Sequence, residues 1–149
     1  MAAMNRLTRV RRGTDLETDI VQSDCVCACN PSLETLSTLQ SLCERYGKGL
    51  YVVWSMGMKA ACLVWLGRYE YVTKGRERRS VEYVEVGKVV GKLPFQVLDR
   101  PVYEPCVSAV MAGVMSQDVL KVVTGQGEPI CNLFLYDSQS GNGVIQLLA

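Results

Sequence analysis

Residues 25–54 read CVCACNPSLETLSTLQSLCERYGKGLYVVW, and this stretch decides the fold class. Its first five and last five residues are continuously apolar, which is typical of parallel strands buried on both faces. Between them, leucines recur at three- and four-residue spacing, which predicts an amphipathic helix. We expect Asn30 or Ser32 to cap this helix and Gly47 to end it. A strand, a helix and a strand in this order predict a βαβ crossover, and hence an α/β sheet.

Downstream of this unit the pattern changes to short apolar runs that no longer alternate with helices. Residues 62–65 and 69–72 predict strands, which we expect to extend the sheet in antiparallel fashion. A strong helix is predicted over residues 105–124, with Gly125 as its C-terminal cap. Residues 133–148 then predict a hairpin that turns at Gly141-Asn142-Gly143.

These elements define one domain over residues 15–149, because a chain of 149 residues is long enough for a single core. Residues 74–101 contain a basic cluster and two prolines, and we expect a variable surface excursion there. Residues 1–14 are expected to form a disordered basic tail. The four arginines of this tail also fit a mitochondrial presequence, although the tail is short and contains little serine.

The overall charge argues against two classes of partner. Sixteen basic and fifteen acidic residues leave a formal charge of +1, so we expect neither nucleic acid nor an acidic membrane surface as a partner. No stretch approaches the roughly 18 consecutive apolar residues of a membrane helix. The chain has seven cysteines, no histidine and no secretory signal, which favours reduced thiols in a nuclear and cytoplasmic protein.

Cys25, Cys27 and Cys29 suggest a metal site until their spacing is considered. Residues two apart in a strand lie roughly 6.5 Å from each other, whereas thiolates on one tetrahedral zinc lie roughly 4 Å apart. We therefore expect no metal, and we interpret the three thiols as buried and slow to react. Cys106, near a helix N-terminus, is an alternative candidate for thiol chemistry. Asp137 is an alternative candidate for a cation site, although an acid that opens a glycine-rich turn is commoner.

None of the glycine pairs fits a phosphate-binding loop, which stands between a strand and a following helix. The pairs Gly47/Gly49 and Gly125/Gly127 follow helices, and Gly141/Gly143 lies too close to the C-terminus. Residues 87–93 read GKVVGKL, which has one residue too few and a leucine where the hydroxyl belongs. We therefore expect no cofactor and no catalytic residue in this chain.

Two stretches carry a resemblance to a known family. Residues 105–121 read PCVSAVMAGVMSQDVLK, and they are followed by Pro129, by FLYD at 134–137 and by GNG at 141–143. This segment resembles the last helix and hairpin of the smaller, non-catalytic subunit of SUMO-activating enzymes, in the ubiquitin-like-protein-activating (ThiF-type) family. Residues 24–27 and 66–72 look like earlier strands of the same subunit. The resemblance implies a partial ThiF/Rossmann-like sheet.

The resemblance also implies a role. In the family, such a subunit docks on a catalytic partner, which adenylates the ubiquitin-like modifier with ATP and magnesium. The family's additional nucleotide-fold half, with an arginine that reaches the partner's ATP, has no counterpart in these residues. A truncated, pseudo-adenylation domain with a regulatory role is therefore expected. The alternative is an α/β protein-interaction module with no role in modifier activation.

A stripe of small residues marks the expected contact with the partner. Ala109, Ala112, Gly113 and Ser116 share one face of the predicted helix, and small side chains let another backbone approach closely. Together with Gln117 they form the expected partner interface. The other interpretation is that this face packs on the chain's own sheet.

Overall fold

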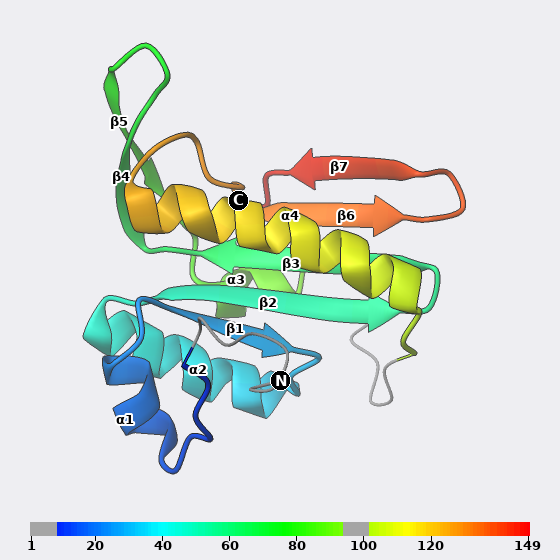
Figure 1. The fold of residues 1–149 in the computed structure, drawn as a ribbon, viewed down its shortest axis with the longest axis horizontal. Helices are drawn as coiled ribbons and strands as arrows, with labels where there is room; N and C mark the ends of the chain where they lie inside the picture. The colour runs from blue at the N-terminus through cyan, green and yellow to red at the C-terminus, as the bar shows by residue number, and fades with distance from the viewer. Residues whose placement is uncertain (1–8, 94–101) are drawn as a thin grey trace.

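The computed structural model of the protein describes residues 9–93 and 102–149. Its main sheet has five strands in the order β1-β2-β3-β6-β7 (Figure 1). Their bounds are Cys25–Cys29, Gly49–Met56, Lys59–Trp65, Leu133–Asp137 and Asn142–Gln146. Strands β1 and β2 are parallel, and the other neighbouring pairs are antiparallel. The sheet is therefore mixed, as the sequence predicts, but the expectation that residues 69–72 extend it is wrong, because they belong to a separate two-stranded sheet.

The βαβ crossover is confirmed. Helix α2 spans Leu33–Tyr46 and joins the two parallel strands. The hydroxyl of Ser32 accepts a hydrogen bond from the amide of Thr35, so Ser32 is the N-cap rather than Asn30. Gly47 ends the helix in the left-handed conformation, at φ 62°. Asn30 instead lies at the end of β1, where its side-chain oxygen accepts a hydrogen bond from the amide of Ser55.

Helix α4 spans Pro105–Thr124, as predicted, and Gly125 caps it at φ 66°. It lies in front of the sheet in Figure 1, across β2 and β3, and it buries Val107 and Met111. By length and composition α4 could cross a membrane, with a mean hydropathy of 1.4, and only 17% of the apolar window is buried. Most of this apolar helix therefore faces away from the chain's own core.

The prediction that β1 is buried on both faces is wrong. Cys27 and Cys29 are exposed, and Cys25 is only half-buried. Cys27 pairs with Tyr51, whose hydroxyl contacts α4, so the cysteines lie on the α4 side of the sheet. Helix α4 covers β2 and β3 on that side, but β1 is at the edge of the sheet and stays uncovered.

The expected surface excursion is partly folded. Strand β4 (Arg68–Val72) pairs with β5 (Arg78–Glu82) in a separate antiparallel hairpin, and α3 spans Val86–Val90. Tyr83, Val86 and Val89 belong to the core, so residues 83–90 are not a surface loop. The remainder of the segment, residues 94–101, lies outside the described residues.

The N-terminal segment contains one unpredicted helix. Helix α1 spans Leu16–Val21, is capped by Asp15 and packs against α2. Residues 9–14 form neither helix nor strand and are exposed. Residues 1–8 of the expected tail lie outside the described residues.

Candidate interaction surface

A buried carboxylate fixes the orientation of α4 on the sheet. Asp118 is 1% exposed and accepts hydrogen bonds from the Tyr51 hydroxyl at 3.0 Å and from the Ile130 amide at 3.0 Å. Its third partner is Lys121 one turn later, with 3.3 Å between Nζ and Oδ1. The carboxylate thus ties α4 to β2 and to the loop that precedes β6.

The surroundings of Tyr51 in this network change its pKa. Burial raises the pKa of Tyr51, and the negative charge of Asp118 beside it raises that pKa further. The phenol therefore stays protonated and donates its hydrogen bond to Asp118 at any physiological pH. A buried carboxylate that accepts several hydrogen bonds is costly to leave unpaired, so α4 has one strongly preferred rotation on the sheet.

That rotation turns the small-residue face of α4 toward solvent. Ala109, Ala112, Gly113, Ser116 and Gln117 are all exposed. A Cβ added to Gly113 would meet nothing within 4 Å. The interpretation that this face packs on the chain's own sheet is therefore wrong. The five residues of the expected partner interface do lie together on one accessible face.

The outward face of α4 carries no charge, although it is exposed. Leu120 is 63% exposed and Val123 is 57% exposed, and they extend the small-residue face toward the end of the helix. The two charged residues of α4 are Asp118, which is buried, and Lys121, which is paired with it. Helix surfaces that face water usually carry charged residues, and exposed apolar patches mark interaction sites.

The cysteines of β1 lie on the same side of the sheet as this face. The interaction with the Cys27 thiol lowers the pKa of Cys25 to about 7. The same interaction raises the pKa of Cys27, because the shared hydrogen bond favours its protonated form. Cys27 and Cys29 add exposed surface at the edge of the sheet, on the side that carries α4.

The other sequence candidates lie apart from one another. Cys106 is exposed in the first turn of α4. Asp137 at the end of β6 accepts a hydrogen bond from the Gln139 amide at 2.9 Å, which lowers its pKa, and it pairs with Lys59 at 3.5 Å. The glycine-containing segment 87–93 begins inside α3 instead of linking a strand to a helix. Within residues 9–93 and 102–149, no group of three or more metal-ligating side chains could hold an ion.

Sequence reasoning missed the role of Asp118. The available signal was a single acidic residue in a mostly apolar helix, because a carboxylate that is buried there needs a hydrogen-bonding partner. Sequence alone could not identify Tyr51 of β2 as the partner of Asp118, because the two residues lie 67 positions apart along the chain.

Fold and site together define a Rossmann-like mixed α/β domain that presents an uncharged helix face. A solved structure described as the crystal structure of SeMet PaaA shares this fold, with a TM-score of 0.59 and 15% sequence identity. The match covers 89% of this chain and 44% of the PaaA chain. No family model matches the sequence.

Sequence similarity is confined to a short region. SUMO-activating enzyme subunits 1B-1 and 1B-2 of Arabidopsis thaliana are each 42% identical over 45 residues, and subunit 1A is 43% identical over 42 residues. The matches to subunits 1B-1 and 1B-2 cover 30% of this chain and 14% of each relative. The similarity relates the chain to ubiquitin-like-activating enzymes.

Proposed function

We propose that the chain is a non-catalytic, regulatory subunit, or part of one, of a SUMO-type modifier-activating enzyme. It docks on a catalytic partner subunit, and that partner adenylates the modifier with ATP and magnesium. No residue of this chain takes part in the chemistry. We expect such a complex to work in the nucleus and cytoplasm, as the sequence predicts.

The observation that carries the proposal is the outward face of α4. Helix α4 has twenty residues, and its outward face exposes apolar and small side chains and no charged one. A surface of this kind is typical of a site that another molecule covers. The segment that contains α4 also carries the family resemblance. A protein partner fits better than a lipid bilayer, because Asp118 fixes α4 against β2 and because irregular backbone next to it would have to enter the bilayer.

The test compares two identical substitutions on two helices. Ser116 and Ser41 are both exposed, and each hydroxyl donates to a backbone carbonyl in the preceding turn at 3.0 Å. Ser116→Arg places a charge on the outward face of α4, whereas Ser41→Arg places it on α2. In a pull-down with the catalytic subunit of a SUMO-activating enzyme, we expect only Ser116→Arg to lose the partner. Equal recovery of both variants would contradict the proposed interface.

The second candidate function is a protein-interaction module with no role in modifier activation. It is favoured by the small share of each relative that the similarity covers. The same pull-down separates the two functions, because only the proposed subunit retains the catalytic subunit of the enzyme. Binding to liposomes that Ser116→Arg abolishes would instead identify α4 as a membrane-contacting helix.

A further inference from the structure

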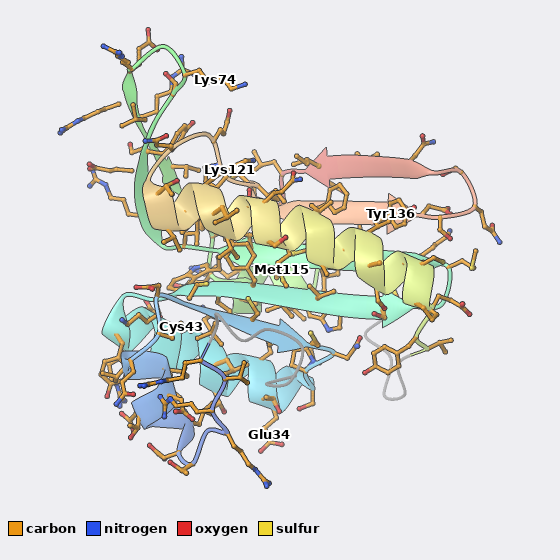
Figure 2. All side chains as sticks on the ribbon, in the orientation of Figure 1. Glu34, Cys43, Lys74, Met115, Lys121 and Tyr136 are labelled. Carbon is orange, nitrogen blue, oxygen red and sulfur yellow. The ribbon has the colours of Figure 1, made fainter. Side chains whose placement is uncertain are left out.

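A groove lies between the β4–β5 hairpin and the C-terminal end of α4, away from the centre of the outward face. Its volume is about 600 Å³, and its lining includes Val72, Lys74, Arg76, Lys121, Thr124 and Gly125. Figure 2 shows Lys74 on the projecting hairpin and Lys121 near the end of α4 below it.

The two walls of the groove are joined by backbone hydrogen bonds. The amide of Val72 donates to the carbonyl of Gly125 at 2.9 Å, and the amide of Gly127 donates to the carbonyl of Val72 at 2.8 Å. The Tyr69 hydroxyl also donates to the carbonyl of Val122 at 2.8 Å. The groove is therefore a preformed feature of the fold, which lowers the entropic cost of binding.

The charge of the groove is one-sided. Lys74, Arg76 and Lys121 line it, and no acidic side chain does. Lys121 is held by Asp118 and by the carbonyl of Glu128 at 3.0 Å. Lys74 and Arg76 form no ion pair with any residue in the described part of the chain.

The negative end of α4 is partly offset, because two carbonyls of its last turn accept hydrogen bonds. The carbonyl of Lys121 accepts from the amide of Gln126 at 3.1 Å, and that of Val122 accepts from Tyr69. A capped helix end projects less negative potential than an open one.

Arg76 adds an independent observation. Its backbone is in the left-handed region at φ 63°, at the tip of the hairpin, where glycine or asparagine is favoured. An arginine there is less favourable than a glycine, because its Cβ crowds the backbone in this conformation. Strained residues of this kind concentrate at functional sites.

We propose that this groove binds an acidic segment of a partner protein, an extended peptide with carboxylates on either side of an apolar side chain. Lys74 and Arg76, which form no ion pair in the described part of the chain, pair with the carboxylates, and Val72 and the methyl group of Thr124 contact the apolar side chain. Nucleic acid fits less well, because the cations of the groove span one short hairpin and a helix end, and the chain's formal charge is only +1. The proposal is independent of a role in modifier activation.

The test uses the full chain and a fluorescent pentapeptide with one leucine between two pairs of glutamates. Fluorescence anisotropy is expected to show binding that weakens as sodium chloride rises from about 0.05 to about 0.5 M. The same peptide with glutamine in place of glutamate is expected to bind at least about tenfold more weakly. Tighter binding of a single-stranded oligonucleotide of equal charge would overturn the proposal.

Charge reversal locates the site. Lys74→Glu with Arg76→Glu is expected to weaken peptide binding about tenfold, because two attractive contacts become repulsive. The control is Arg9→Glu with Arg12→Glu, which changes the net charge equally at exposed positions in the segment before α1. If both double variants weaken binding equally, the groove is not the site.

A third variant separates a loss of peptide binding from a loss of folding. Arg76→Gly removes one cation and relieves the backbone strain, so we expect its melting temperature to equal or exceed that of the wild type. Peptide binding is expected to weaken about threefold. Wild-type affinity in this folded variant would overturn the role of Arg76 and with it the proposed site.

Discussion

Single residues decide which side of α4 meets the sheet. Asp118 is the clearest case, because one carboxylate pairs with a strand, with a loop and with its own helix. A buried charge of this kind is tolerated only when its partners are present. The accessible face of α4 is thus a consequence of one acidic residue on its opposite side.

Removal of that carboxylate tests its role. Asp118→Ala leaves the Tyr51 hydroxyl and the Ile130 amide without their partner, so we expect the free energy of unfolding to fall by about 3 kcal/mol. Asp24→Ala is the control, because Asp24 is exposed and makes no hydrogen bond or ion pair within the described residues, and it should change stability by less than about 0.5 kcal/mol. Urea unfolding of both variants gives the comparison. Equal stabilities would contradict the role of Asp118 in holding α4 on the sheet.

The thiols of β1 are expected to react, contrary to the prediction from sequence. Cys25 has a pKa of about 7, so its alkylation rate should rise steeply as the pH increases through 7, when the thiolate forms. Cys27→Ala removes the side chain whose interaction lowers this pKa and should shift the midpoint toward higher pH. Peptide mass spectrometry after timed iodoacetamide labelling measures both rates, and a pH-independent rate at Cys25 would contradict the assignment.

At the scale of the element, α4 shows that composition and burial are separate properties. Its apolar residues suffice for a fully buried helix, yet only Val107, Met111 and Asp118 are buried. The small-residue face is free because neither the sheet nor another described helix covers it. Gly113 is therefore not required for packing within this chain.

Glycine substitutions distinguish an open position from a filled one. Gly113→Ala is expected to stabilise the isolated chain by about 0.8 to 1 kcal/mol, because alanine is the better helix former and its Cβ meets open space. Gly143→Ala is the contrasting variant, because a Cβ there would lie 2.7 Å from the Phe134 ring, and it should be destabilising. Melting temperatures report both changes. A loss of stability in Gly113→Ala would mean that the face packs within the chain after all.

The whole molecule has its core at β2 and β3, which are flanked by strands on both sides and lie next to α4. Residues on both strands are almost continuously buried, whereas every residue of β7 is exposed. The two edges of the sheet, β1 and β7, are correspondingly accessible. Stability should therefore decrease from the centre of the sheet toward its edges.

Hydrogen exchange measures this gradient. The amides of β2 and β3 that are bonded to neighbouring strands should exchange most slowly, at a rate set by global unfolding. The amides of β7 should exchange much faster, because fraying of an edge strand exposes them without unfolding the core. Equal protection of β7 and β3 would show that another part of the chain, or a second molecule, covers this edge.

Local sequence determined the elements that depend on neighbours along the chain. The leucine spacing of α2, the cap at Ser32, the left-handed glycines at 47 and 125 and the terminal hairpin all follow from periodicity and turn chemistry. Tertiary structure alone decided which faces are buried. An apolar run such as residues 25–29 does not state whether its strand is central or at an edge, because burial depends on helices supplied from elsewhere. Likewise the stripe on α4 predicted a contact surface, but only the contact between Asp118 and Tyr51 showed that it faces outward.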